Sequence, residues 1–562
     1  MSVSLDTVVV LIATILVFFL QAGLAMIETG ITRAKNSGNI IMGKVVGFAL
    51  SILAFCLFGY HLMFGTSFPG IFGIGAPVVP AGGKLDASLF MIYQAMLCAV
   101  TVSIVFGAMA ERLKFNACCI YSLFIAAVVY PVSGHWINGG GWLSRLKFHD
   151  FAGSTSIQLV GGMAALIGTV VLGARSGKYD QHGNPKAIPG HNMTLSALGV
   201  FILIFGWVGL GAGRILLGEK TAVLGTVYAN IILSAAAAVV VSMCVTWLRF
   251  KKPDVVFTIS GAVAGLAAIS AGCDVVSPTG AVIIGALAGA LTTFGMEFLD
   301  KHLHIDDPVG VICMNGLAGV FGTFMVGFFS TKDGLLFGGG LYTTGIQMLG
   351  IVAVGIWTAV SCLVVLSILN GMDTLRVTHE EELAGLDRVE HGIANSYADF
   401  MPSIEALEAA DKNIRPRSEP PEGTIKTGEP FHRPVRLLGS EITRIDILLN
   451  ESRFEALKQE LNHIGITGMT VFNVSGCGMQ KGGKEFYRGV EVDMTLLPKL
   501  KVEIVVCKVP VELVIQTAKK ALYTGNIGDG KIFVYSVENA IKVRTDEEGF
   551  DALQDDVHPI PS

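Results

Sequence analysis

Polar side chains inside long apolar stretches are the first residues of this sequence whose chemistry needs an explanation. Asp150 and Gln158 belong to the segment "DFAGSTSIQLVGG", and Asn315 belongs to "VICMNGLAG". A charged or amide side chain within a membrane span is costly unless it faces a cavity or a polar partner. Eight residues rotate a helix by about 800°, so Asp150 and Gln158 lie within about 80° of each other. Both are therefore predicted to face one interior cavity.

Each of these residues also has a structural interpretation, which the sequence leaves open. Asp150 stands at a predicted helix start, where a carboxylate can accept hydrogen bonds from backbone N–H groups. The two amides could instead bind the backbone of neighbouring helices. If the membrane part consists of inverted repeats, however, the fifth and tenth spans correspond to each other. Gln158 and Asn315 would then form a pair near the bilayer midplane.

The composition supports a membrane protein and excludes several other classes. Of the 562 residues, 52% are hydrophobic, and the formal net charge of −5 is too small to indicate a nucleic-acid partner. The ten cysteines form no C-x-x-C pair, so neither a disulfide framework nor a zinc site is indicated. We find no nucleophile–base pair and no hydrolytic metal motif, and we therefore do not expect an enzyme.

Eleven apolar stretches are long enough to cross a bilayer as helices. They lie at about 6–29, 44–68, 88–110, 115–134, 151–173, 192–217, 221–248, 254–272, 276–299, 308–330 and 339–370. The first stretch lacks a basic segment and a cleavage site, so we interpret it as a span and not as a signal peptide. One alternate set of loops carries twelve basic residues and the other carries six. The more basic side is predicted to be cytoplasmic, which places the N-terminus outside and the long tail inside.

The tail is predicted to contain a second domain. Residues 371–400 are charged and helix-like, and residues 401–438 are rich in proline and polar residues, which is typical of a linker. In residues 439–562, strand patterns ("EITRIDILL", "ITGMTVFNVS", "KLKVEIVVCKV", "KIFVYSVE") accompany two helical patterns ("ESRFEALKQELNHIG", "VELVIQTAKKAL"). Their order, β-α-β-β-α-β, predicts a ferredoxin-like α+β domain.

Several motifs resemble the ammonium transporter (Amt/Mep/Rh) family. They run in order from about residue 20 to 397: "QAGLAMIETGITRAKNSGNI", "AMAERLKF", "DFAGSTS", "IPGHN", "FGWVGLGAG", "AGLAAISAGC", "DDPVG" and "LRVTHEEELAGLDRVEHG". The resemblance implies that residues 1–370 form an α-helical ammonium transporter domain of eleven transmembrane helices with an inverted repeat. It also implies a homotrimer in which each subunit has its own ammonium pore.

The resemblance assigns positions along the ammonium path. Asp150 and Trp207 retain the family's residues, and Ser270 replaces a threonine. Other positions depart from the family: Gln158 and Asn315 replace the two pore histidines, Leu97 and Leu210 replace the two gate phenylalanines, and Arg214 and Asn138 replace the external-site serine and tryptophan.

These replacements lead to three alternative functions. Amides cannot titrate, whereas imidazoles relay protons near neutral pH. Leucines lack the aromatic face that attracts a cation, and an arginine at the mouth repels one. We expect either a transporter that handles ammonium or a non-conducting ammonium sensor. A transporter of another small solute is the third alternative.

Residues 439–562 resemble the PII signal-transduction proteins through "ITGMT", "GMQKGGKEFYRG", "LPKLKVEIVV" and "TGNIGDGKIFVY". The resemblance implies a trimer that binds ATP or ADP, and 2-oxoglutarate beside Mg²⁺ and ATP. Glycine-rich turns expose backbone N–H groups to phosphate, and Lys531 adds a charge. The assigned nucleotide-binding residues are Thr470, Gly478, Met479, Gly528, Asp529, Gly530, Lys531, Lys542 and Arg544. Gln480, Gly482 and Lys499 are assigned to 2-oxoglutarate and Mg²⁺, with Gln480 as the metal ligand, and Tyr487 and Arg488 to the T-loop.

The two resemblances together predict a multi-pass protein of the inner (plasma) membrane with its PII domain in the cytoplasm. The expected partners are ammonium, the lipid bilayer, two further copies of the chain and cytosolic proteins of nitrogen regulation.

Overall fold

The structure of the chain is a computed structural model that describes residues 5–77, 86–217, 223–393, 442–450, 453–466, 468–476, 485–487, 490–492, 497–523 and 530–553. The chain divides into two compact units, a mainly helical one built by the elements up to α16 and an α+β one that begins with β3. The predicted linker, residues 401–438, lies outside the described residues.

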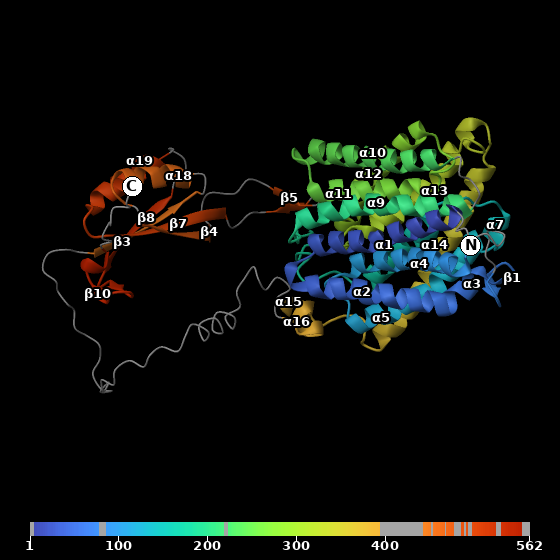
Figure 1. Cartoon of the computed structure of the whole chain (residues 1–562), viewed down its shortest axis with the longest axis horizontal. Coiled ribbons are helices and arrows are strands. Elements are labelled where there is room, and N and C mark those ends of the chain that lie inside the picture. Colours follow the sequence, from blue (N-terminus) through green and yellow to red (C-terminus); the bar gives the residue numbers. More distant parts are fainter. Residues whose placement is uncertain are drawn as a thin grey trace. The chain divides into compact units, whose positions relative to one another are not determined.

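Long apolar helices build the first unit (Figure 1). Ten of the described helices are long and apolar enough to cross a membrane. The predicted span 254–272 corresponds to α11, which has only 15 residues. The elements are α1 (Leu5–Ile31), η1 (Ala34–Asn36), α2 (Ser37–Ala54), η2 (Phe55–Gly59), α3 (Tyr60–Phe64), β1 (Thr66–Phe68), β2 (Phe72–Ile74), α4 (Ala87–Met109), α5 (Phe115–Phe124), η3 (Ile125–Val129), α6 (Tyr130–Asn138), α7 (Trp142–Arg145), η4 (Ser154–Leu159), α8 (Val160–Leu172), α9 (Met193–Leu217), α10 (Leu224–Phe250), α11 (Val255–Ile269), α12 (Pro278–Lys301), η6 (Ile312–Leu317), α13 (Ala318–Phe329), η7 (Leu335–Phe337), α14 (Tyr342–Gly371), α15 (His379–Ala384) and α16 (Leu386–His391).

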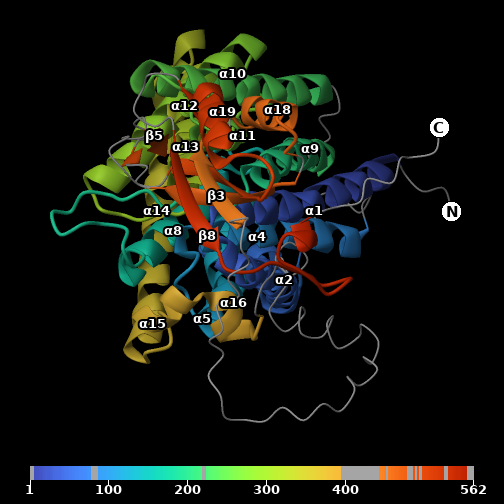
Figure 2. The same cartoon turned by 90° about the vertical axis from the view of Figure 1, so that its left-hand side faces the viewer.

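Glycines let the helices of this unit approach one another closely. Helix α1 packs along α9, beside which it lies in Figures 1 and 2. A Cβ atom on Gly199 of α9 would lie 2.7 Å from the carbonyl oxygen of Gly23 on α1. Because nothing larger than hydrogen fits between these backbones, the glycines here are required for packing.

Two helices in the interior begin with a π-helical turn, and these turns carry the amides noted in the sequence. Turn η4 runs into α8, and turn η6 runs into α13. The two helices cross backbone to backbone, because a Cβ atom on Gly162 would lie 2.2 Å from the Cα atom of Gly316. A Cβ atom on Gly319 would likewise lie 2.5 Å from the carbonyl oxygen of Ser154. The crossing therefore fixes the distance between η4 and η6.

The second unit is a four-stranded antiparallel sheet with two helices. The strand order is β4-β7-β3-β8, and all three pairs of neighbouring strands are antiparallel. Helices α18 and α19 lie side by side on one face of the sheet (Figure 2) and bury an apolar core that includes Ile447, Leu461, Val502 and Val514. The elements of the chain from β3 onward are β3 (Ile442–Leu449), α18 (Phe454–His463), β4 (Thr470–Gly476), β5 (Glu485–Tyr487), β6 (Val490–Val492), β7 (Leu497–Val506), α19 (Val511–Leu522), β8 (Lys531–Val537), β9 (Ile541–Lys542), β10 (Glu547–Glu548) and η10 (Asp551–Leu553). The four principal strands and the two helices thus fall where the sequence patterns predicted them.

The glycine crossing leads to a first prediction. Gly162→Ala should lower the free energy of unfolding by about 1–3 kcal/mol, because the added methyl group would collide with the backbone of Gly316 and not with a movable side chain. Thermal unfolding of the purified protein in mild detergent measures the change.

Gly355→Ala is the matched control on α14, where an added Cβ atom would meet only the Cε atom of Met163, 3.8 Å away. Equal melting temperatures for the Gly162 variant and the wild type would show that the crossing does not hold the two helices together.

Candidate functional site

The two interior amides contact each other directly. Asn315 Nδ2 donates a hydrogen bond of 2.7 Å to Gln158 Oε1, and both side chains are completely buried. The structure thus brings together the two residues that the sequence placed in corresponding spans. In this hydrogen bond each amide binds the other amide and not the backbone of a neighbouring helix.

The amide pair keeps one donor group and one acceptor atom without a partner among the described residues. These are Gln158 Nε2 and Asn315 Oδ1, both buried. If the oxygen and nitrogen assignments of both amides were exchanged, one donor and one acceptor would again lack a partner among the described residues. A buried polar atom is costly when it lacks a hydrogen bond. The pair is therefore suited to a small guest that forms hydrogen bonds.

An aspartate fixes the start of each amide-bearing turn. Asp150 accepts hydrogen bonds from the backbone N–H groups of Thr155 (3.2 Å) and Ser156 (2.8 Å). Asp307 accepts from the N–H groups of Gly310 (2.7 Å) and Ile312 (2.8 Å). Both oxygens of Asp150 hold the helix start, as the capping interpretation of the sequence described.

Sequence reasoning missed Asp307. The spacing contained the signal, because Asp307 precedes Asn315 by eight residues, as Asp150 precedes Gln158. The repeated spacing gives the helix formed by η4 and α8 the same pattern as the helix formed by η6 and α13. The two halves of an inverted repeat would correspond in this way.

Trp207 and Ser270 form a second polar contact in the interior of the first unit. Trp207 Nε1 donates to Ser270 Oγ over 2.8 Å, and both residues are buried. Ser270 Oγ in turn donates to the carbonyl oxygen of Leu266 over 2.8 Å. The hydroxyl group thus accepts from the indole and donates to its own helix, which fixes the orientation of the indole ring.

The two leucines at the expected gate positions are buried. Leu97 and Leu210 are each 1% exposed and belong to the apolar core of this unit. Tyr93, about one turn before Leu97 on α4, donates its hydroxyl hydrogen to the carbonyl oxygen of Leu210 over 3.1 Å. This hydrogen bond holds α4 against α9 where the two leucines lie. Neither leucine offers an aromatic face to a cation.

Arg214 and Asn138, which the resemblance placed at the external site, lie in contact. Arg214 Nη1 donates to Asn138 Oδ1 over 3.2 Å. Arg214 Nε and Asn138 Nδ2 are buried and have no partner among the described residues. A positive charge at this place opposes the approach of another cation.

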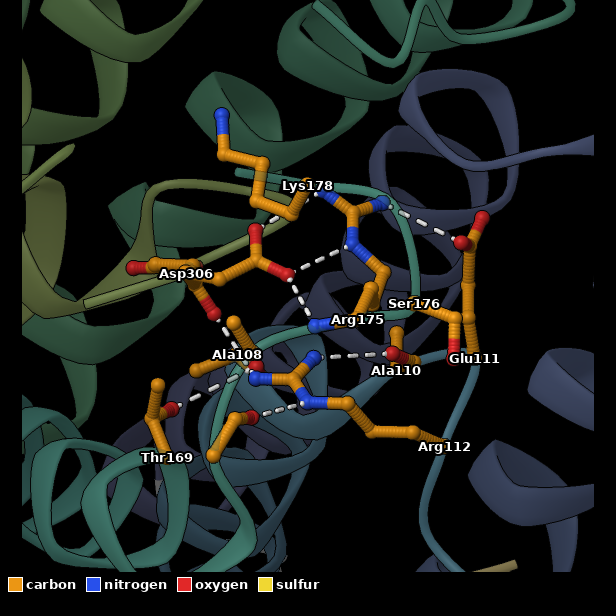
Figure 3. A network of polar contacts seen from close by, with 12 residues as sticks. Ala108, Ala110, Glu111, Arg112, Thr169, Arg175, Ser176, Lys178 and Asp306 are labelled. Atoms are coloured by element: carbon orange, nitrogen blue, oxygen red, sulfur yellow. Dashed lines mark hydrogen bonds and ion pairs between the residues drawn. The ribbon is translucent and has the colours of Figure 1, made fainter. Parts of the chain in front are cut away.

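A network of charged side chains joins the loop after α8 to the loop before η6 (Figure 3). Arg175, after α8, contacts both oxygens of Asp306, which precedes η6, with distances of 2.8 Å from Nε and 2.9 Å from Nη2. Arg175 Nη1 also donates to Glu111 Oε2 over 3.1 Å. Arg112 Nη2 donates to the backbone oxygen of Asp306 over 2.7 Å. The network thus joins the start of η6 to the end of α8.

Burial and charge act in opposite directions on these carboxylates. Burial disfavours the charged form of Asp306, but Arg175 and Arg112 more than compensate and hold its pKa well below the ordinary value. Burial opposes ionisation of Glu111 in the same way, and Arg175 and Arg33 lower its pKa. Glu111 also has a φ of +73°, a conformation that residues other than glycine rarely adopt. Its contacts with Arg33 and Arg175 hold it there.

Residues 376–391, which we call the C-terminal clamp, bind to this network. Glu382 is 1% exposed and accepts from Ser176 N (2.7 Å) and Ser176 Oγ (2.9 Å), directly after Arg175. Asp387 accepts from Gly38 N (2.9 Å) and Asn39 N (2.8 Å) in the first turn of α2. The clamp therefore caps α2 and holds the loop that ends α8. Its residues lie in "LRVTHEEELAGLDRVEHG", which the sequence indicated as a charged, helix-like segment and as one of the motifs of the resemblance.

The expected nucleotide residues of the second unit are described only in part. Gly478, Met479, Gln480, Gly482, Arg488, Gly528 and Asp529 lie outside the described residues, as does the side chain of Tyr487. Thr470 begins β4, Lys542 ends β9, and Arg544 is exposed. Lys499 on β7 donates to Asn450 Oδ1 over 3.2 Å. The described members thus lie in different elements of the sheet unit.

The turn before β8 requires glycine. Gly530 has a φ of +122°, and a Cβ atom there would lie 2.2 Å from the carbonyl oxygen of Leu448. Lys531, the next residue, is exposed at the start of β8. A tight glycine turn followed by lysine can bring backbone N–H groups and a positive charge close to a phosphate.

Comparison with known proteins gives two family matches. Residues 8–396 match the model of the Ammonium Transporter Family, and residues 442–547 match the model of Nitrogen regulatory protein P-II. Ammonium transporter Amt2 of Archaeoglobus fulgidus is 40% identical over 432 residues, which cover 72% of this chain and 91% of that protein. An ammonium transporter of Bacillus subtilis is 31% identical over 411 residues, 70% of this chain and 99% of that protein.

Solved structures resemble the first unit as well. A structure named Sensor Amt Protein has a TM-score of 0.66 and 34% identity, and the match covers 69% of this chain and 98% of that one. Mep2 of Saccharomyces cerevisiae has a TM-score of 0.60 and 26% identity, and the match covers 67% of this chain and 88% of that one.

The charged network leads to a second prediction. Asp306→Asn should lower the free energy of unfolding at pH 7 by about 3–5 kcal/mol, because Arg175 stays buried and loses one of its two carboxylate partners. A carboxylate with a depressed pKa stabilises the folded state above its unfolded pKa of about 3.9, and this stability is lost as the pH falls toward the folded pKa. The deficit of the variant should therefore be complete at pH 7 and shrink below about pH 4. Thermal unfolding at both pH values measures it.

Asp180→Asn is the control, because Asp180 is not buried and lies in the loop after α8. A variant at Asp306 that melts like the Asp180 variant at pH 7 would show that the buried pair contributes nothing to stability.

Proposed function

Because the chain belongs to the ammonium transporter family, we propose that it handles ammonium across the membrane at a site formed by Gln158 and Asn315, with its P-II domain as the regulatory partner. The observation that carries this proposal is the buried amide pair with its unpartnered atoms. Asn315 Oδ1 is an acceptor for an N–H group of ammonium. Gln158 Nε2 is a donor for a lone pair of ammonia or of an accompanying water molecule.

The amide pair also supports a second candidate function, a non-conducting ammonium sensor. The amides bond to each other, and neither can accept or relay a proton near neutral pH. The contact between Arg214 and Asn138 places a positive charge at the proposed outer mouth. The similarity to a structure named Sensor Amt Protein agrees with this candidate. A transporter of another small solute is a third candidate, but the family match favours ammonium.

We further propose eleven spans in an inverted repeat, with α11 as the eighth span. The nearly complete burial of α11 supports this count, because a helix inside the bundle can be shorter than one that faces lipid. The repeated aspartate–amide spacing supports the inverted repeat. With the N-terminus outside, the clamp and the P-II domain are cytoplasmic. The strand order and the two helices support a ferredoxin-like P-II fold, and a homotrimer satisfies the symmetry implied for both parts.

The P-II domain is proposed to bind ATP or ADP, and 2-oxoglutarate together with Mg²⁺ and ATP. The described residues fit such anions, because the tight turn at Gly530 and the charges of Lys531, Lys542 and Arg544 suit phosphate, and Lys499 suits a carboxylate. The proposed Mg²⁺ ligand, Gln480, belongs to the part of the chain that the structure does not describe. Proteins of nitrogen regulation are the proposed cytosolic partners.

Coupling between the two parts is proposed to pass through the C-terminal clamp. Glu382 holds the loop that follows α8, and Arg175 in that loop holds Asp306 before η6. A force that displaces the clamp therefore acts on both helices that carry the amides. The same contacts allow the opposite direction, in which ammonium at the amides changes the clamp and the P-II domain responds.

The third prediction concerns conduction. Wild-type protein in liposomes should carry little ammonium current, because the amides relay no proton. A variant with Gln158→His, Asn315→His, Leu97→Phe and Leu210→Phe should carry a larger current, since it regains titratable and cation-attracting groups. Current on a solid-supported membrane after an ammonium jump measures both.

Liposomes that contain the Gly355→Ala protein serve as the control for protein content and leak. A large, saturable current in the wild type would show that amides suffice for conduction, and the sensor candidate would lose its support.

The fourth prediction concerns the P-II ligands in the full-length protein. Lys499→Ala should weaken 2-oxoglutarate binding in the presence of Mg²⁺ and ATP at least tenfold, because breaking a charge pair of this kind costs about 2–5 kcal/mol. Its ATP affinity should stay unchanged, because the proposed phosphate contacts come from other residues. Calorimetry measures both ligands.

Lys458→Ala, on the exposed surface of α18, is the matched control and should bind both ligands like the wild type. Failure of the wild type to bind either ATP or ADP would rule out the regulatory role of the domain.

A further inference from the structure

We infer that His149 and Asp274 form a pH-sensitive strut beside the candidate pathway, and that the charge of His149 sets how firmly the segment around Asp150 is held. The inference rests on the proposed function, because it concerns the same pathway. His149 Nε2 donates to Asp274 Oδ1 over 2.8 Å. The side chain of Asp274 is 1% exposed, whereas that of His149 is 28% exposed. Water therefore reaches the imidazole while the carboxylate stays buried.

The backbone of His149 is held from another side by Gln347 of α14. His149 N donates to Gln347 Oε1 over 2.9 Å, and Gln347 Nε2 donates to the carbonyl oxygen of His149 over 2.7 Å. Gln347 is completely buried. Because the amide of Gln347 uses both its oxygen and its nitrogen on the backbone of His149, this backbone can shift little without breaking one of these hydrogen bonds.

The strut closes one end of a longer row of hydrogen bonds. Phe151 N donates to the carbonyl oxygen of Ala271 over 3.0 Å, and Ala152 N donates to that of Ser270 over 2.7 Å. Segment 149–152 is thus joined to segment 270–274 by two backbone hydrogen bonds and by the strut. The first segment contains Asp150, which caps η4. The second contains Ser270, which orients Trp207. The strut therefore joins the two sides of the pathway.

The charge of an imidazole changes between about pH 5 and pH 8. A protonated imidazole donates a stronger hydrogen bond to a carboxylate than a neutral one does. The hydrogen-bond partners of His149 on other elements are the carboxylate of Asp274 and the neutral amide of Gln347. Its own segment carries Arg145, Lys147 and Asp150. Protonation should therefore tighten the strut, and a rise in pH should loosen it.

The direction in which ammonium affinity changes with pH distinguishes two roles of His149. One is positioning of the segment around Asp150, and the other is a direct electrostatic effect on the cation. Loss of the proton makes the pair of His149 and Asp274 more negative by one charge, which by itself would attract a cation more strongly. If His149 acts by positioning, ammonium affinity instead falls as the strut loosens. The two causes thus predict opposite slopes between pH 5.5 and pH 8, a range in which ammonium remains protonated.

The first experiment needs no ligand. Hydrogen exchange with mass spectrometry follows the peptide around residues 149–155 of the full-length protein, after correction for the intrinsic effect of pH. Wild-type protection should fall about fivefold between pH 5.5 and pH 8, because a hydrogen bond between two charged groups becomes one with a neutral donor. His149→Gln keeps a donor that does not titrate and should show no such fall. Asp274→Asn, which removes the charged acceptor, should also be flat.

His304→Gln is the matched control. His304 also donates through Nε2, here to the backbone oxygen of Gly183, but lies on the loop between α12 and η6. Its peptide 149–155 should keep the wild-type pH profile. The same fall in the wild type and in His149→Gln would overturn the strut.

The second experiment measures binding of ammonium chloride to the full-length protein at the same pH values. Wild-type affinity should fall with rising pH, and the affinity of His149→Gln should not change. A wild-type affinity that rises with pH would overturn the positioning role. Absence of ammonium binding at every pH would contradict the proposed function, whereas the strut itself is decided by hydrogen exchange alone.

Discussion

The backbone contact between Gly162 and Gly316 is the constraint on which the interior of the membrane unit depends. Only at this close approach do two turns from different thirds of the chain come near enough for Asn315 to reach Gln158. A polar pair in an apolar interior is tolerable only when its members satisfy each other or a guest. The close approach of the two glycines therefore allows the amides to form one hydrogen-bonded pair. Without it, each amide would be buried without the other as its partner.

The charged residues of the network around Arg175 are buried in loops at the ends of helices. Asp306, Glu111, Arg112 and Arg175 follow or precede the helices and do not interrupt them. Each carboxylate has at least one guanidinium partner, so the charges are balanced locally. The C-terminal clamp uses the same chemistry, with Glu382 and Asp387 on backbone N–H groups. The buried charges of this network are thus paired with one another, whereas the amide pair is neutral.

The sequence predicted the elements better than it predicted the contacts. Hydropathy located the long helices, and alternation located β3, β4, β7 and β8, because these patterns follow from burial alone. The pairing of Gln158 with Asn315 could be anticipated from the repeat. The estimate that Asp150 and Gln158 share a helix face assumed regular winding, but Gly153 has a φ of +99° and η4 is π-helical. Asp150 precedes the helix and caps it.

Other contacts could not be predicted from a single sequence. Glu382 bonds with Ser176 across about 200 positions of the chain, and only the packed bundle brings them together. The strut between His149 and Asp274 likewise joins two loops whose separation in sequence says nothing about their distance. The shortness of α11 was also hidden, because hydropathy continues through the turn that follows the helix.

The π-helical turns have a mechanical consequence. Such a turn closes its hydrogen bonds over five residues, so it stores one residue more than regular winding needs. If either turn converts to regular winding, every side chain on one side of it rotates by about 100° about the helix axis. The amide would leave its partner although the axes of the helices stay where the glycine crossing holds them. The pair can therefore open by a change in winding number, without any tilt of a helix.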